Sequence, residues 1–304
     1  MATNNILPFC ETDTGTNLLS QADYSVSSDR TSGQKAGVAS SKLNNKALRQ
    51  AALIASQVAQ YISDATGDDV LDNGDTSAIL ATMVQAWQKT APTIQKFTSG
   101  SGTYTRPSPA PLYIKVRMVG AGGGGGGSGS LSGGSTGGTG GDTTFGTSLL
   151  IAAGGTGGVE RAGQAGNGGA VTVNSPAVDV ASTAGSFGNG AISAGGSSPS
   201  GGGGGTSPFG GAGGGGPGVG SSSNVTAIAN SGSGGGGGGA ANNSTQQGGS
   251  GGGSGGYIEA VIFSPSSSYS YSVGAAGTAG SAGNIGQAGG AGGSGLIIVE
   301  EFYQ

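Results

Sequence analysis

The chain has 304 residues, of which 72 are glycine, and charged residues make up only 9%. Disordered chains combine low hydrophobicity with many charges, so a composition with 34% hydrophobic residues meets only half of that signature. The net charge is −4, and Arg161 is the only basic residue beyond Met118. Because Lys and Arg supply most of the affinity for nucleic acids, we expect no nucleic-acid partner.

Cys10 is the only cysteine, and the chain contains no histidine. One cysteine forms neither a disulfide framework nor a cysteine-cluster metal site. With no histidine base and only scattered carboxylates, we expect no enzyme activity, no cofactor and no metal. The N-terminus lacks the basic and apolar regions of a secretory signal, and no apolar run approaches the ~20 residues that cross a bilayer. We therefore expect assembly in a cytosol, from which the protein is later released.

Residues 1–96 hold nearly all of the helix-forming residues. Residues 44–67 predict a helix, because apolar residues recur at spacings of three and four, and Gly67 is a suitable C-terminal stop. This apolar stripe consists of Leu48, Ala51, Ala55, Val58 and Ile62. Such a stripe is compatible with a core inside the chain and with a coiled-coil-like seam between subunits, and the pattern leaves both open.

A second helix is predicted over residues 77–89. Asp75 or Thr76 can cap its N-terminus, Pro92 ends it, and we expect Trp87 to lie in the core. Two short helices give only a small core for about 95 residues. We therefore expect this region to be completed by burial against partner subunits.

Alternating apolar residues then predict strands on both sides of the glycine-rich region. Residues 97–112 form a proline-stiffened connector, and the strand 113–119 follows, with Lys115 and Arg117 on a solvated face. Further strands are expected at the segments 257–263 and 269–273, joined as a hairpin, and from residue 296 to the C-terminus. The two ends of the glycine-rich region can therefore meet in one sheet.

The glycine runs themselves predict a packed scaffold. Glycine disfavours helices and weakens strands, which leaves the polyproline II conformation, with three residues per turn. Without Cβ atoms, several such segments can pack laterally and satisfy one another's backbone groups. The predicted fold class is thus mostly β and irregular: a small α-helical N-terminal domain at 1–96, the connector at 97–112, and a β-bracketed domain of packed polyglycine II helices at 113–304.

The loops between glycine runs are the candidate binding elements. They are rich in Ser, Asn and Thr, and rigid scaffolds tend to carry function on their loops. The candidate site residues are Phe187, Phe209, Asn224, Asn242 and Asn243. The phenylalanines are either receptor anchors or plugs that close the ends of the glycine bundle. The asparagines are either receptor contacts or ordinary turn residues.

Several segments resemble tail-fibre proteins of phages and prophages. From residue 97 onward, "FTSGSGTYTRPSPAPLYIKVRMVGAGGGGGG", "GGDTTFGTSLLIAAGGTGG" and "YSVGAAGTAGSAGNIGQAGGAGGSGLIIVEE" follow the order found in their glycine-rich C-terminal domain. Earlier, "LPFCETDTGTNLLSQADY" and "GVASSKLNNKALRQAALIASQVAQYI" are similar to a segment that attaches such fibres to the tail. The glycine-rich part is also similar to the tip adhesin of T-even-like phages, in which loops on stacked polyglycine II helices grip an outer-membrane protein.

The resemblance implies a receptor-binding protein of the virion. It implies a homotrimer, with other tail proteins as partners of the N-terminal domain. It also implies a bacterial outer-membrane protein or surface glycan as the receptor. The alternative is a glycine-rich structural or coat protein without a specific ligand.

Overall fold

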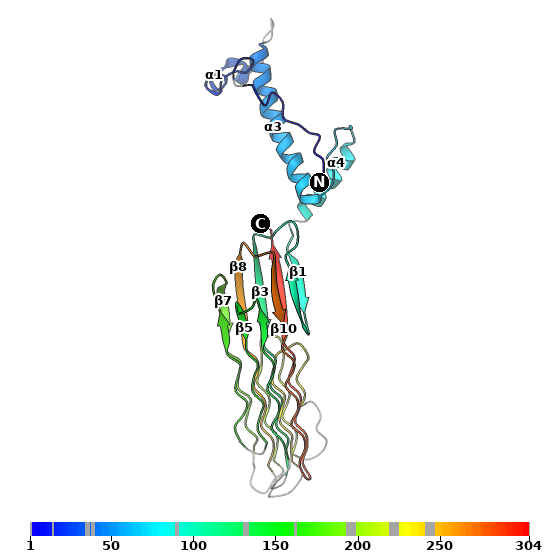
Figure 1. Ribbon diagram of the computed structural model, residues 1–304, viewed down its shortest axis with the longest axis vertical. Helices are drawn as coiled ribbons and strands as arrows, with labels where there is room; N and C mark the ends of the chain where they lie inside the picture. Colours follow the sequence, from blue (N-terminus) through cyan, green and yellow to red (C-terminus); the bar gives the residue numbers. More distant parts are fainter. Residues whose placement is uncertain are drawn as a thin grey trace. The chain divides into compact units, whose positions relative to one another are not determined.

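The computed structural model divides the chain into two compact units, Met1–Ala91 and Pro92–Gln304 (Figure 1). The boundary falls before strand β1 (Thr93–Phe97), which pairs within the second unit together with β2 (Ser101–Thr105). The end of the expected N-terminal domain and part of the expected connector therefore belong to the second unit. The structure describes residues 2–13, 15–33, 37, 40–88, 91–129, 134–160, 163–192, 199–218, 225–240 and 247–303.

The described part of the first unit contains the two expected helices and two short ones, α1 (Gln21–Val26) and α2 (Ser28–Ser32). Helix α3 covers Ser41–Thr66, and Gly67 ends it in the left-handed conformation with a φ of 78°. Helix α4 covers Thr76–Gln88. The Asp75 carboxylate accepts a hydrogen bond of 3.0 Å from the Ala78 N–H, so the predicted N-cap is confirmed.

The core of the first unit is small, as expected, but it uses only one residue of the predicted stripe. Its buried apolar side chains are those of Ala59, Ile62, Val70 and Ala86. Of the predicted stripe, only Ile62 is buried, whereas Leu48 and Val58 are exposed. The prediction of a core position for Trp87 was wrong, since this side chain is 58% exposed. The apolar stripe of α3 therefore faces outward in the single chain.

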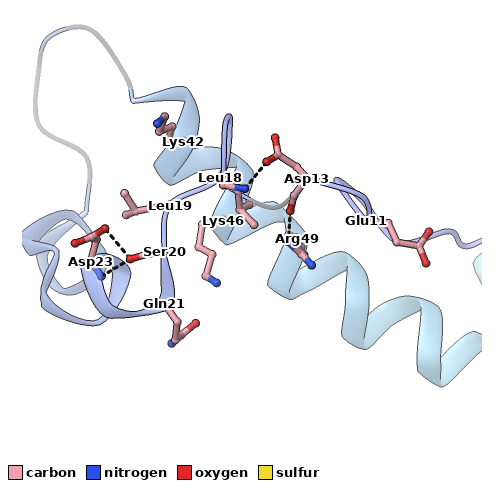
Figure 2. Close-up of a pocket in the computed structure, with 11 residues that line it drawn as sticks. Glu11, Asp13, Leu18, Leu19, Ser20, Gln21, Asp23, Lys42, Lys46 and Arg49 are labelled. Atoms are coloured by element: carbon pink, nitrogen blue, oxygen red, sulfur yellow. Dashed lines mark hydrogen bonds between the residues drawn. The ribbon is translucent and has the colours of Figure 1, made fainter.

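A cavity of about 560 Å³ lies in the first unit, between the first turns of α3 and the segment that leads into α1 (Figure 2). Acidic, basic and apolar side chains line it together. Arg49 of α3 donates a hydrogen bond of 3.1 Å to the Asp13 carbonyl oxygen. This bond connects the helix to the opposite wall of the cavity.

The second unit contains two five-stranded antiparallel sheets. In the first sheet, the order is β1, β10 (Leu296–Phe302), β3 (Tyr113–Val119), β8 (Tyr257–Phe263) and β7 (Val178–Thr183). In the second sheet, the order is β2, β9 (Ser268–Ser272), β4 (Thr143–Phe145), β5 (Leu150–Ala152) and β6 (Val171–Val173). Inward-facing side chains of both sheets, such as Ile114, Met118, Ile258, Phe145 and Leu150, form one apolar core.

The ends of the glycine-rich region do meet in one sheet. Strand β3 pairs with both β8 and β10, and Val116 lies opposite Ala260 on one side and Val299 on the other. The predicted hairpin between 257–263 and 269–273 is wrong, because β8 and β9 belong to different sheets. Pro265 and the serines after it carry the chain from one sheet to the other.

Glu301 ties the first strands of the second unit to the last one. Its carboxyl group is 1% exposed and accepts hydrogen bonds from Tyr104 of β2 (3.0 Å), from Gln95 of β1 (2.7 Å) and from the Thr93 hydroxyl. Burial, followed by this bond to Glu301, raises the pKa of Tyr104. The neighbouring Glu300 points to the other face of β10, as the alternation of a strand requires.

Glycine-rich segments run on directly from eight of the strands, β3 to β10 (Figure 1). The segment after β3, residues 120–128, is fully buried and has a different hydrogen-bond partner at each position. Gly122, Gly123 and Gly124 donate to Gly293 (2.8 Å), Gly253 (2.9 Å) and Gly138 (2.9 Å), which lie on three different segments. Gly125 then returns to the first of these segments through Gly290 (2.8 Å).

The same segment accepts hydrogen bonds from three further neighbours. The donors to the carbonyls of Ala121, Gly122 and Gly123 are Gly155, Gly277 and Gly235, each at 2.9 Å. Three segments accept from it and three donate to it, so six surround it. The stretch that reads as a linker in the sequence is thus the centre of the glycine-rich body.

Close approach of the backbones explains why this segment contains only glycine between Ala121 and Ser128. A Cβ atom added to Gly122 would lie within 3.0 Å of the Ser233 carbonyl, and one added to Gly125 within 3.0 Å of the Gly236 carbonyl. Real Cβ atoms essentially never come so close to another atom. Any side chain here would separate segments whose backbone groups hydrogen-bond to one another.

The Gly122→Ala variant is expected to unfold with a free energy about 1–3 kcal/mol lower than that of the wild type, because overpacking moves the backbone. Gly211→Ala is the matched control, since an added Cβ there meets nothing within 4 Å. The control is expected to be unchanged or up to about 1 kcal/mol more stable, because alanine restricts the unfolded chain. Urea unfolding followed by tyrosine fluorescence measures both. Equal effects of the two substitutions would contradict the packing described above.

Candidate functional site

The glycine-rich body has one end at the sheets and one end remote from them. At the sheets, the Gly120 N–H donates to Gly256 (2.9 Å), and farther along the same two segments Gly126 donates to Ser250 (2.9 Å). Gly129 and Gln247 form the last bridge of this pair. Gly129 and Gln247 therefore lie at the remote end.

Several described segments end at this remote end. Ala240 donates to the Pro199 carbonyl at 3.0 Å and forms a bridge with Gly286. Ser128, next to Gly129, donates through its hydroxyl to the Gly239 carbonyl. The segment ends gathered in this way adjoin residues 130–133, 193–198 and 241–246 in the sequence. Segment ends that are far apart in the sequence therefore lie in one small area.

The described residues on either side of 219–224 lie slightly nearer to the sheets. On one side, Gly216 donates to the Gly237 carbonyl (2.8 Å), and on the other side the Val225 carbonyl accepts from Gly236 (2.7 Å). Both contact the same buried segment, residues 232–240, which also ends at the remote end. The chain ends on both sides of residues 219–224 therefore lie along the same segment as the other segment ends.

The structure does not bring the five predicted site residues together. Asn224, Asn242 and Asn243 lie outside the described residues. Phe187 is 70% exposed. Its neighbours Ser186 and Gly188 donate to the Ser254 hydroxyl (2.8 Å) and the Gly166 carbonyl (2.9 Å). These contacts put Phe187 on the flank of the glycine-rich body.

Phe209 lies at the sheet end of the body. Its ring packs edge-on against Tyr257, the first residue of β8, with 5.6 Å between the ring centroids. A cavity of about 210 Å³ adjoins Tyr257, between residues 183–186 and 206–208. Phe209 therefore covers the junction between glycine segments and sheet and does not reach the remote end. In the sequence, the small polar segments between the glycine runs were the feature that pointed to this candidate site.

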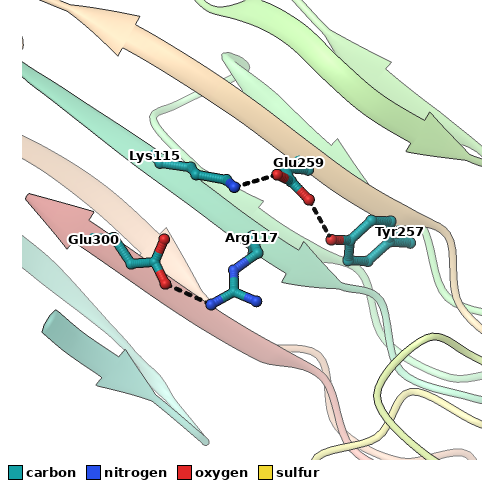
Figure 3. A network of polar contacts seen from close by, with 5 residues as sticks. All are labelled: Lys115, Arg117, Tyr257, Glu259 and Glu300. Atoms are coloured by element: carbon teal, nitrogen blue, oxygen red, sulfur yellow. Dashed lines mark hydrogen bonds and ion pairs between the residues drawn. The ribbon is translucent and has the colours of Figure 1, made fainter.

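Ion pairs on the outer face of the first sheet fix the strands from which the central glycine segments start (Figure 3). Lys115 of β3 pairs with Glu259 of β8, and Arg117 of β3 pairs with Glu300 of β10 at 2.5 Å. The Tyr257 hydroxyl donates to the Glu259 carboxylate at 2.9 Å. The expectation of a simply solvated face for the two basic residues is corrected by these pairs.

These contacts change the acid–base properties of the residues involved. The hydrogen bond from Lys115 is the largest influence that lowers the pKa of Glu259 below its ordinary value of 4.5. Burial, followed by the hydrogen bond to Glu259, raises the pKa of Tyr257 from 10.0 to about 12. Tyr257 therefore stays protonated, and keeps donating to Glu259, over the neutral range.

In the described ranges of the chain, no three His, Cys, Asp or Glu side chains lie together in a way that could hold a metal ion. Among the helices described, none is both long and apolar enough to cross a membrane. The remote end remains the candidate site because segment ends gather there.

The Tyr257→Phe variant is expected to lose about 1 kcal/mol of stability at neutral pH, since it lacks the bond to Glu259. A pKa raised on folding contributes stability that is complete below pH 10 and is lost as the pH rises towards 12. The difference in the free energy of unfolding between wild type and variant should therefore become smaller as the pH rises from 10 to 12. Urea unfolding at a series of pH values measures it. In a spectrophotometric titration the variant should also lack one late-titrating tyrosine, and an unchanged titration would contradict the assignment.

Comparison with protein-family models and with curated proteins finds no match for this chain.

Proposed function

We propose that the protein is a phage tail fibre that attaches the virion to a bacterial surface receptor. The glycine-rich body acts as the scaffold, and the loops at its remote end bind the receptor. A bacterial outer-membrane protein is the favoured receptor, and a surface glycan is the second choice. The observation that carries the proposal is the gathering of segment ends from distant parts of the sequence at one end of a rigid body.

The glycine segments are proposed to be polyglycine II helices. This conformation has three residues per turn, so the hydrogen-bond direction should repeat at every third residue. The backbone N–H groups of Gly122, Gly125 and Ser128 donate to one neighbouring segment, at Gly293, Gly290 and Gln287. The residues between them donate to two other segments, each of which is also contacted at every third residue. This threefold pattern supports the assignment.

In a scaffold of this kind, the residues that stabilise the fold are different from the residues proposed to bind the receptor. The buried segments permit almost no side chains, whereas the sequences that adjoin Gly129, Ala240 and Pro199 contain them. The loop 241–246 reads "ANNSTQ" and the loop 193–198 reads "SAGGSS". Small polar side chains of this type suit adaptable hydrogen bonding to a receptor. Several fibres on one virion would multiply the weak contacts of each.

The N-terminal unit is proposed to join the fibre to other tail proteins and to form a homotrimer. Leu48, Ala51, Ala55 and Val58 on the exposed side of α3 support a seam between subunits. Their spacing of three and four residues is that of helices that pack along one another. Assembly would take place in the host cytoplasm, and the mature protein would be part of the virion.

The loops can be tested with purified, fluorescently labelled full-length protein and a panel of bacterial strains. Replacing 241–246 by a Gly-Ser sequence of equal length is expected to weaken cell binding at least about tenfold, because contacts at the centre of an interface carry most of the affinity. The control replaces Ser266 and Ser267 by glycine. Both lie exposed in the β8–β9 connection, at the far side of the sheets. The control is expected to bind like the wild type.

The alternative of a structural or coat protein predicts a different outcome. It expects no saturable binding to any strain, or binding that the loop replacement leaves unchanged. Selection of bacteria that no longer bind, followed by sequencing of what they have lost, would then identify the receptor. Recurrent loss of one surface protein would agree with the favoured receptor, and loss of glycan-synthesis genes with the second.

A further inference from the structure

Three basic side chains of α3 line the cavity in the N-terminal unit. Lys42, Lys46 and Arg49 are separated by four and three residues, so they project from the same side of the helix. All three belong to the lining of the cavity, and Lys46 and Arg49 are half-buried. Figure 2 shows them along α3, facing the segment that carries Leu18 and Ser20.

These cations have no ion-pair partner among the described residues. The ion pairs there are Lys115–Glu259 and Arg117–Glu300, both in the second unit. Arg49 donates to the Asp13 backbone carbonyl, and with the hydrogen bond from the Gly15 N–H its charge helps to lower the pKa of the Asp13 carboxyl group. Lys42 and Lys46 are therefore the basic groups of the cavity that remain most available to a ligand.

The acidic groups that line the same cavity are occupied locally or turned away. The Asp13 carboxylate accepts from the backbone N–H groups of Gly15 (2.7 Å) and Asn17 (2.9 Å), and the Gly15 bond is the largest influence that lowers its pKa. The Asp23 carboxylate accepts from the Ser20 hydroxyl at 2.6 Å. Figure 2 shows the Glu11 carboxylate turned away from Lys46.

Helix stability does not account for the position of the cations. The first turns of a helix carry partial positive charge, so acidic residues stabilise them and basic residues do not. Helix α3 has no acidic residue in its first turn, and its basic residues lie within the first third of its length. Its acidic residue, Asp64, lies near the other end. The arrangement runs against the preference of the helix.

We propose that this cavity is the site at which the N-terminal unit binds a carboxylate-rich segment of a neighbouring virion protein. The inference rests on the proposed attachment role of this unit and names the chemistry of its partner. Arg and Lys bind carboxylates through charge-assisted hydrogen bonds. A volume of about 560 Å³ accommodates several side chains, and Leu18 and Leu19 add an apolar wall.

A peptide segment fits the cavity better than a nucleic acid does. Glu11, Asp13 and Asp23 lie in the lining between the cations, and a continuous row of phosphates would pass close to them. A protein segment can place carboxylates opposite Lys42, Lys46 and Arg49 and neutral side chains opposite the acids. The mixture of charges therefore favours a ligand in which neutral groups separate the carboxylates.

The test uses the full-length protein and a short fluorescein-labelled peptide in which glutamate alternates with alanine. Fluorescence anisotropy is expected to show binding that weakens as salt increases, because salt screens the charges. The K42Q/K46Q variant is expected to bind about tenfold more weakly. The matched control R30Q/K96Q also removes two exposed positive charges, and its affinity is expected to stay within about twofold of the wild type.

Further variants keep the result interpretable if K42Q/K46Q folds poorly. K42R/K46R retains both charges and is expected to bind like the wild type, and R49Q alone is expected to weaken binding. Circular dichroism reports whether α3 is intact in each variant. Equal losses in K42Q/K46Q and R30Q/K96Q, no dependence on salt, or binding of a DNA oligonucleotide in preference to the peptide would each overturn the proposal.

Two other readouts separate this inference from the proposed function and from self-association. Cell binding of K42Q/K46Q should equal that of the wild type, so failure of the wild type to bind cells counts against the receptor-binding role alone. Sedimentation should give K42Q/K46Q the oligomeric state of the wild type. A changed oligomeric state would mean that the cavity binds a second copy of this chain, which overturns the assignment to another virion protein.

Discussion

The second unit depends on backbone hydrogen bonds between glycine segments that lie too close together for side chains. Each N–H from Gly122 to Gly127 donates to a carbonyl on another segment, at 2.8–2.9 Å. Hydrogen bonds to six surrounding segments are possible only because no Cβ atom holds the backbones apart. A composition with 72 glycines is thus a direct requirement of this packing. Satisfied backbone groups take the place that interlocking side chains hold in other interiors.

The two sheets supply what the glycine segments lack. Glycine segments alone have no side chains to select their neighbours, so their lateral order could change. Strands β3, β8 and β10 have a defined register, fixed by their apolar core and by the pairs Lys115–Glu259 and Arg117–Glu300. Because glycine segments continue directly from these strands, the order of the strands in the sheet determines which glycine segments lie next to one another. Side-chain specificity at one end therefore organises a body that has little of its own.

Much of this architecture follows from local sequence patterns. Alternation predicted β3, β8 and β10, and the caps Gly67 and Asp75 predicted where α3 ends and α4 begins. Features that depend on distant contacts were not predictable in this way. A turn at Pro265 does not reveal whether the chain stays in one sheet or crosses to another. The strands β1 and β2 are short, and neither shows the alternation of apolar and polar residues that marks β3 and β8.

The candidate site was predictable in kind but not in position. The small polar loops between glycine runs were visible in the sequence, whereas their common end depends on how far each segment runs before it turns. Phe187 and Phe209 stood out as isolated aromatic residues, yet the register places them on the flank and at the sheets. Periodicity likewise found the apolar stripe of α3, but only a packed structure shows that it faces outward. The cavity beside Lys42, Lys46 and Arg49 could not be predicted, because its other wall is formed by residues 11–23, whose conformation the sequence pattern does not reveal.

The interior of the glycine-rich body also has a thermal consequence. Unfolding usually raises the heat capacity because apolar surface becomes exposed to water, whereas newly exposed peptide groups lower it. The buried segments 120–128, 232–240 and 248–256 would expose mainly peptide groups. Their contribution to the heat-capacity change is therefore small or negative, and the stability of this unit should vary little between cold and warm conditions.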